Sequence, residues 1–276
     1  MQVPSTDGVS VAVHDLGGSG PPLVIAHATG FCGRVYEPLA AALGRAYHVW
    51  ALDFRGHGES TVPSLDALHW HRITDDLAAA VAAVADGAPV PVFGHSMGGA
   101  CALLLEHRQP GTFQWAYLYE PIVLPTMPEA GERPNVLAEG AARRRATFAS
   151  RAEAMYRYAE RPPLSGMRAD CLRAYVEHGF ADDPDGGGVT LRCPPMVEST
   201  VFRRSGDITL EHLVGITIPV TVATGLITPD FGPASWGAIQ SDALLLGRLE
   251  CHDALGHLGP MQDPDAVAAA ILRAAV

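Results

Sequence analysis

One serine of this chain stands in a setting that suits nucleophilic chemistry. Ser96 is the centre of GHSMG, a G-x-S-x-G pattern at residues 94–98, between a short apolar run and a helix-forming run that begins at Met97. A tight strand-to-helix turn exposes the serine hydroxyl, and glycine two positions to either side removes side chains that would clash there. The alternative is an ordinary glycine-rich turn, and the flanking strand and helix argue against it.

A serine hydroxyl needs a partner that takes its proton, and twelve histidines compete for that role. His257 follows the last predicted strand and precedes the closing helix, and Gly256 and Gly259 allow a tight loop around it. We therefore predict that His257 is the general base that activates Ser96. Three other histidines near predicted turns are interpreted as packing or hydrogen-bonding residues: His57, His95 and His252.

Four motifs, in their order along the chain, resemble hallmarks of the α/β-hydrolase family. They are IAHATGF (25–31), DFRGHGES (53–60), the GHSMG turn and GHLGPMQDP (256–264). The resemblance covers nearly the whole chain outside a central insertion. It implies an α/β-hydrolase fold, with a mostly parallel central sheet flanked by helices, and it assigns the nucleophile to the third motif and the histidine to the fourth.

Acyl transfer places negative charge on the carbonyl oxygen, and backbone N–H groups usually stabilise that charge. One donor is expected from Met97, directly after the nucleophile. The family resemblance places the second donor two residues after His27, at Thr29. This chain has Ala28 where the family commonly has glycine, a change that leaves the backbone N–H in place.

The imidazole also needs a carboxylate that fixes its tautomer. Most members of the family carry an aspartate after the seventh strand, but Thr228 stands at that position here, and the nearest carboxylate is Asp230. A second arrangement places the acid at the end of the sixth strand, where this chain has Glu120 in YLYEPIVLP. That stretch resembles haloalkane dehalogenases and fungal zearalenone lactone hydrolases, which place a glutamate at the same point.

A carboxylate in an otherwise apolar strand is costly to bury unless it has a partner. That cost favours a functional role for Glu120 over the alternative acid Asp230. The opposing interpretation of Glu120 is an exposed residue at a strand end.

The elements that position these residues alternate between strand and helix over residues 1–121. Short apolar runs predict buried strands at 21–28, 46–54, 89–95 and 113–121. Residues 122–208 do not continue this alternation of strands and helices. They contain no convincing buried strand, so they are predicted to form a helical cap. The alternation resumes over 209–276, which predicts a core in two parts, 1–121 and 209–276, with the cap inserted between them.

The cap is expected to set substrate choice. Arg143, Arg144 and Arg145 could meet an anionic substrate, but adjacent arginines on a helix point in different directions, and a solvated surface is the preferred interpretation. An apolar pocket suits a medium-sized uncharged ester or lactone. Seven cap residues are candidates for its lining: Met155, Tyr156, Tyr158, Met167, Phe180, Met196 and Phe202.

Composition narrows the range of partners. The net charge of -11 argues against nucleic acid and against an anionic membrane surface. No apolar run approaches the ~20 residues of a membrane span, and the N-terminus shows no signal-peptide pattern. The five cysteines, odd in number and without metal-ligand spacing, are interpreted as free thiols. We expect a cytoplasmic protein without metal or cofactor, acting on a small-molecule ester or lactone.

These features predict a serine hydrolase that cleaves a carboxylic ester or lactone through an acyl-enzyme on Ser96, with His257 as general base. Dehalogenase and epoxide hydrolase chemistry in this fold needs an aspartate nucleophile, so the serine argues against both. A non-hydrolytic lyase or cyclase and a ligand-binding receptor remain alternatives, because a fold does not fix a function. A hydrolase of C–C bonds would use the same triad.

Overall fold

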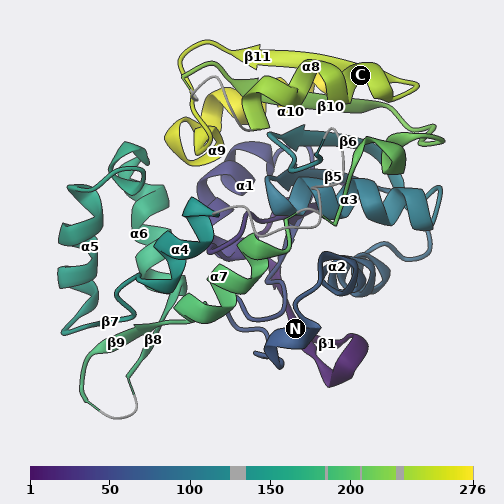
Figure 1. The fold of residues 1–276 in the computed structure, drawn as a ribbon. Helices are drawn as coiled ribbons and strands as arrows, with labels where there is room; N and C mark the ends of the chain where they lie inside the picture. Colours follow the sequence, from purple (N-terminus) through teal and green to yellow (C-terminus); the bar gives the residue numbers. More distant parts are fainter. Residues whose placement is uncertain (125–134, 184–185, 206, 228–232, 276) are drawn as a thin grey trace.

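The computed structural model describes residues 1–276 except 125–134, 184–185, 206, 228–232 and 276. A sheet of eight strands forms its centre, in the order β1-β2-β4-β3-β5-β6-β10-β11 (Figure 1). Strand β2 runs antiparallel to β1 and β4, and the remaining neighbours are parallel. This confirms the predicted, mostly parallel sheet. The strands are β1 Gln2–Pro4, β2 Ser10–Asp15, β3 Pro22–Ala26, β4 His48–Leu52, β5 Val90–His95, β6 Phe113–Tyr119, β10 Val220–Gly225 and β11 Gly247–His252.

Helices cover both faces of the sheet, which is why its central strands are apolar throughout rather than alternating. All six residues of β5 are buried. One apolar core contains side chains of α2 and α3, and a second contains side chains of α1 and α10. The helices of this domain are α1 Glu37–Leu43, α2 Trp70–Val84, α3 Met97–Arg108, α8 Pro233–Ala243, α9 Gly259–Gln262 and α10 Pro264–Ala274.

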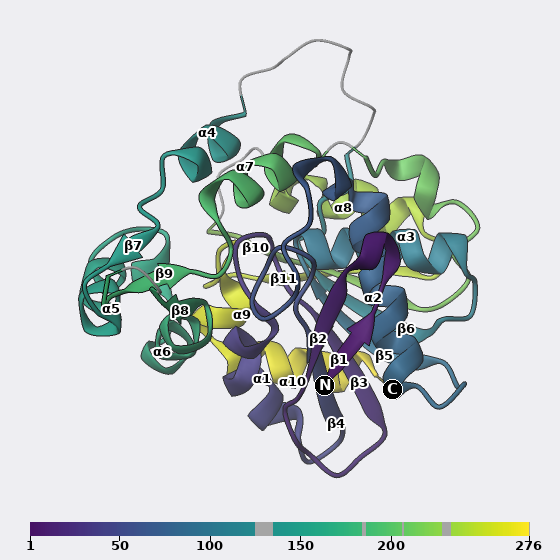
Figure 2. The same ribbon diagram turned by 90° about the horizontal axis from the view of Figure 1, so that it is seen from below.

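In the described part of the segment between β6 and β10 there are four α-helices and a small sheet, and Figures 1 and 2 show them grouped on one side of the main sheet. The helices are α4 Val136–Ala142, α5 Arg151–Ala159, α6 Ala169–His178 and α7 Pro195–Arg203. The antiparallel sheet has the order β7-β9-β8, with β7 Thr147–Phe148, β8 Phe180–Asp182 and β9 Val189–Leu191. Strands of two or three residues are too short to give an alternating pattern, so the sequence did not reveal them. The limits of the cap at 122 and 208 stay a prediction.

Aromatic packing gives this cap its own core. The rings of Phe148, Tyr158, Tyr175 and Phe180 contact one another with centroids 5.6 to 6.2 Å apart. Such tilted and edge-on pairs fix the relative positions of α5, α6 and the small sheet. The cap therefore holds its side chains at defined positions above the main sheet.

Two sequence-based expectations concern the chain as a whole. The five cysteines are free thiols, as predicted, and the structure adds that all but Cys251 are buried. Over the residues that the structure describes, every helix is too short or too polar to cross a lipid bilayer.

Candidate active site

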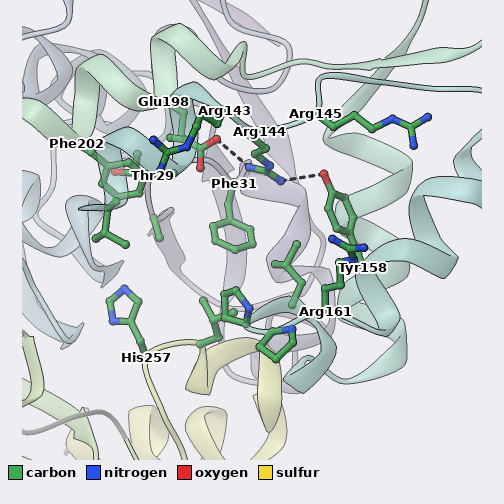
Figure 3. Close-up of a pocket in the computed structure, with 18 of the residues that line it drawn as sticks. Thr29, Phe31, Arg143, Arg144, Arg145, Tyr158, Arg161, Glu198, Phe202 and His257 are labelled. Carbon is green, nitrogen blue, oxygen red and sulfur yellow. Dashed lines mark hydrogen bonds and ion pairs between the residues drawn. The ribbon is translucent and has the colours of Figure 1, made fainter. Parts of the chain in front are cut away.

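The predicted site residues lie beyond the carboxyl ends of neighbouring parallel strands. Ser96 follows β5 directly, Glu120 follows β6, Thr29 comes after β3, and His257 comes after β11. Because parallel strands end at one edge of the sheet, these distant parts of the sequence meet there. Ser96, Thr29 and His257 line one cavity of about 620 Å³ between the core and the cap (Figure 3).

The turn around Ser96 has the strained geometry that the G-x-S-x-G pattern predicts. Ser96 has φ +54° and ψ -113°, a conformation that side-chain-bearing residues rarely adopt. A Cβ atom on Gly94 would lie 2.6 Å from the Cα of Gly99, and one on Gly98 would lie 2.1 Å from the main-chain oxygen of Ala26. Both glycines are therefore needed for the close approach of α3 to the sheet.

Glu120 is fully buried and contacts His257. Its Oε2 lies 2.6 Å from His257 Nδ1, and its Oε1 accepts a 2.9 Å hydrogen bond from the N–H of Gly225. An ionised carboxylate only accepts hydrogen bonds, so His257 Nδ1 carries the proton and Nε2 is left as an acceptor. This is the tautomer that a general base requires.

Glu120 shares an unusual backbone conformation with Ser96. Its φ is +44°, and it is one of four non-glycine residues with positive φ in the part of the chain that the structure describes. The two residues follow adjacent strands, and the N–H of Ser96 donates to the oxygen of Tyr119 at 3.0 Å. Strain of this kind costs on the order of 1–3 kcal/mol per residue and is concentrated at functional sites.

The alternative acid, Asp230, lies outside the described residues, as does Thr228. Two of the histidines assigned to packing have the expected partners. Nδ1 of His57 donates to the oxygen of Arg55 at 3.0 Å, and Nε2 of His252 lies 2.9 Å from the hydroxyl of Tyr117.

Thr29 and Met97 lie next to each other. The Thr29 hydroxyl donates to the sulfur of Met97 at 3.4 Å. The backbone N–H groups of both residues donate to none of the residues that the structure describes. Met97 is the first residue of α3, where the helix dipole adds positive potential. Two such donors beside Ser96 suit an oxygen that becomes negatively charged.

His27 holds the loop that carries Thr29. Its Nδ1 donates to the oxygen of Ala28 at 2.7 Å, and its Nε2 accepts from the N–H of Phe54 at 2.9 Å. Burial lowers the pKa of His27 to about 3, so the ring is neutral at neutral pH, as this pairing requires. The loop after β3 is thereby tied to the turn after β4.

Tyr36 is a buried residue that sequence reasoning missed. Its hydroxyl accepts from the N–H of Ala28 at 3.3 Å and donates to Nδ1 of His95 at 2.7 Å. His95 in turn donates from Nε2 to the main-chain oxygen of His257 at 2.8 Å. These hydrogen bonds connect three separate segments of the chain. No sequence pattern near Tyr36 predicts them.

The arginines at 143–145 match the expected solvated surface only in part, because Arg143 and Arg145 are exposed and Arg144 is not. All three line the cavity. Arg144 is largely buried and forms a 2.8 Å ion pair with Glu198, and it donates to the hydroxyls of Tyr158 and Tyr175. The expectation is wrong for Arg144, because it assumes a continuing helix. Helix α4 ends at Ala142, so helical spacing does not decide where these side chains point.

Two of the seven candidate lining residues reach the cavity, Tyr158 and Phe202. The others are distributed between packing and solvent. Phe180 and Met167 are buried and Met155 packs partly buried beside them, whereas Tyr156 and Met196 are exposed: their exposed fractions are 68% and 53%.

Comparison with known proteins places the chain in a family. A model described as "Alpha/beta hydrolase family" matches residues 23–270. The chain therefore belongs to the alpha/beta hydrolase family, which confirms the resemblance stated for its motifs and the predicted fold.

Individual relatives are more distant. Monoglyceride lipase of Homo sapiens is 35% identical over 120 residues, which cover 42% of this chain and 39% of the lipase. Protein phosphatase methylesterase 1 of Mus musculus is 35% identical over 95 residues, covering 33% of this chain and 25% of that protein. The matched part thus spans less than half the length of either relative. The solved structure of E-2-(acetamidomethylene)succinate hydrolase is similar in fold, with a TM-score of 0.80, 19% identity and coverage of 99% of this chain and 98% of that chain.

Proposed function

We propose that this chain is a serine hydrolase that cleaves a carboxylic ester or lactone through an acyl-enzyme on Ser96. The observation that carries the proposal is the 2.6 Å contact between His257 Nδ1 and the buried carboxylate of Glu120, beside the cavity that Ser96 lines. The names of two partial relatives, a lipase and a methylesterase, support an ester as substrate.

In the proposed first step, Ser96 Oγ attacks the carbonyl carbon while His257 Nε2 takes the hydroxyl proton. The carboxylate of Glu120 stabilises the imidazolium that forms. The carbonyl oxygen becomes an oxyanion and accepts hydrogen bonds from the N–H groups of Thr29 and Met97.

Collapse of this intermediate breaks the bond to the leaving oxygen, which takes the proton from His257. Water then attacks the acyl-enzyme, and His257 accepts a proton from that water. The second collapse releases the carboxylic acid and returns the proton to Ser96 Oγ, so the enzyme is unchanged at the end of the cycle.

The test is hydrolysis of 4-nitrophenyl butyrate, together with covalent labelling by a fluorophosphonate probe. The wild type is expected to do both. Ser96→Ala is expected to lose labelling and to lower kcat by at least ~10³-fold. Ser64→Ala is the matched control, because Ser64 is exposed and its side chain caps no helix, and it should behave as the wild type. Circular dichroism establishes that each variant is folded.

The outcomes separate the alternatives. Labelling and hydrolysis that survive in Ser96→Ala would point to another nucleophile and reject the proposal. A wild type that is labelled but hydrolyses neither a panel of 4-nitrophenyl esters nor simple lactones would favour a lyase, a cyclase or a receptor. A wild type inert in both assays would favour a protein that only binds its ligand.

A further inference from the structure

Positive charge is concentrated at the cavity beside Ser96. Five of the 19 Lys and Arg residues of the chain line it, and Glu198 is the one acidic residue among its described lining residues. The chain as a whole has a net charge of -11, so the charge of the cavity lining is opposite in sign to that of the whole chain. A cleft lined by one sign of charge attracts ligands of the opposite sign. The five residues are Arg143, Arg144, Arg145, Arg157 and Arg161.

Three of these charges are balanced within the protein. Arg143 pairs with Glu139 at 3.8 Å, and both side chains are exposed. Arg144 pairs with Glu198 at 2.8 Å, and both side chains are largely buried. Arg145 pairs with Glu153 at 2.8 Å, in a more exposed position. Each of these guanidinium groups therefore already has a carboxylate partner.

Arg157 and Arg161 are different. Arg157 lies in the last turn of α5, and Arg161 follows four residues later, just beyond the end of that helix. Within the described part of the chain, neither guanidinium group lies within hydrogen-bond or ion-pair distance of a carboxylate, although the pKa of Glu153, lowered mainly by a hydrogen bond from the N–H of Ala149, is lowered further by the charge of Arg157. A guanidinium group presents paired N–H donors that match the two oxygens of a carboxylate. Two such groups on one cavity wall make a suitable site for an anion.

The position of the wall that carries Arg157 and Arg161 indicates which part of the substrate would carry the anion. Figure 3 shows Arg161 beside Tyr158, on the side of the cavity away from His257. Phe31 lies between His257 and Arg161. His257 gives its proton to the leaving group, so the leaving oxygen lies on the His257 side. The acyl part of the substrate then extends past Phe31 toward the arginines.

We infer that the substrate is an ester whose acyl chain ends in a carboxylate, a monoester of a dicarboxylic acid, and that Arg157 and Arg161 bind that carboxylate. The inference rests on the proposed function and names its substrate class. It replaces the sequence-based expectation of an uncharged substrate. The remote carboxylate and the scissile carbonyl occupy opposite sides of the same cavity, with the apolar ring of Phe31 against the chain that joins them.

The test compares two esters of equal chain length, mono(4-nitrophenyl) adipate and 4-nitrophenyl hexanoate. The wild type is expected to have a kcat/KM at least ~10-fold higher for the adipate ester, because a hydrogen bond to a charged group contributes ~1.5–3 kcal/mol. Arg157→Gln and Arg161→Gln should each lower kcat/KM for the adipate ester by ~10-fold, mainly through KM, and change that for hexanoate by less than ~2-fold.

Arg45→Gln is the matched control, because Arg45 is exposed and lies outside this cavity. It should leave both esters unaffected. Raising the NaCl concentration should reduce the preference for the adipate ester in the wild type, since salt screens the attraction. Equal losses with both esters in the cavity variants, or a wild type that prefers hexanoate, would overturn the inference and leave the proposed function standing.

A measurement of adipate binding tests the anion site without relying on catalysis. Isothermal titration of Ser96→Ala with adipate should show binding, and the neutral analogue hexane-1,6-diol should show none. Adding Arg161→Gln should weaken adipate binding by ~10-fold or more. If the wild type hydrolyses no ester, the proposed function fails, and adipate titration alone then decides whether the anion site exists. Failure of adipate to bind would reject the site.

Discussion

His95 donates a 2.8 Å hydrogen bond from Nε2 to the main-chain oxygen of His257. The contact joins the residue before the proposed nucleophile to the backbone of the proposed base. Because Nε2 donates, Nδ1 of His95 must accept, and the hydroxyl of Tyr36 supplies that hydrogen bond at 2.7 Å. The same hydroxyl accepts from the N–H of Ala28, so one chain of hydrogen bonds connects the loop after β3, the turn after β5 and the loop after β11.

Tyr36→Phe tests this chain of hydrogen bonds. Removal of the hydroxyl leaves Nδ1 of His95 and the N–H of Ala28 without their partner, which costs ~1–3 kcal/mol of folding free energy. We expect kcat to fall by ~10-fold with KM nearly unchanged, because Tyr36 positions the loops and does not touch the substrate. Urea unfolding and steady-state kinetics provide the two measurements.

Tyr156→Phe is the control for that substitution, because Tyr156 is exposed on the cap. It should leave stability and kcat at their wild-type values. If Tyr36→Phe destabilises the fold but keeps the full kcat, Tyr36 is a packing residue and has no positioning role.

The identity of the acid is tested by Glu120→Gln and Asp230→Asn. The amide of glutamine cannot stabilise the imidazolium and can present the wrong hydrogen-bonding group to His257 Nδ1, so kcat should fall by ~10³–10⁴-fold. Asp230→Asn should keep wild-type ester hydrolysis. If Asp230→Asn loses activity and Glu120→Gln keeps it, the acid is Asp230. The comparison with the lactone hydrolases would then lose its main support.

Gly98→Ala tests the close approach of α3 to the sheet. The new Cβ would lie 2.1 Å from the main-chain oxygen of Ala26, so the helix must move away from β3. We expect a loss of at least ~3 kcal/mol in the free energy of unfolding, or failure to accumulate folded protein. Thermal and urea unfolding measure this loss.

Gly140→Ala is the matched control, because Gly140 lies within α4 and a Cβ there meets nothing within 4 Å. Alanine is a better helix former than glycine, so this change should stabilise by ~0.5–1 kcal/mol. Similar destabilisation at both positions would contradict the steric argument for Gly98.

The buried histidines predict a loss of stability at mildly acidic pH. Burial lowers the pKa of His27 to about 3 and that of His57 to about 4, whereas an unfolded histidine has a pKa of ~6.5. Below pH ~6.5 the unfolded chain therefore binds protons that the native chain does not, and the free energy of unfolding falls. At pH ~5.5 each of the two histidines should cost ~1.4 kcal/mol relative to neutral pH.

Urea unfolding at pH 7.5, 6.5 and 5.5 measures this dependence. His57→Gln removes one of the two groups, so its stability should fall less steeply with decreasing pH than that of the wild type. A wild-type free energy of unfolding that is constant or higher at pH 5.5 would contradict the prediction.

Local sequence is enough to predict the three residues proposed for catalysis, Ser96, His257 and Glu120. The G-x-S-x-G turn around Ser96 and the glycine-flanked His257 are signalled by neighbouring residues, because a strained turn needs particular side chains missing at fixed positions. Glu120 was favoured because a carboxylate in an apolar strand must find a partner, and the structure brings it against His257.

Only the tertiary structure decided how separate segments meet. Tyr36 contacts Ala28 and His95 through a hydroxyl whose partners lie in other loops, so nothing near it in the sequence predicts these hydrogen bonds. The same holds for the cap, where α4 ends before the three arginines and the cavity collects charges from separate elements. Periodicity and motifs report local backbone and burial, whereas the charge and shape of a cavity depend on packing between distant segments.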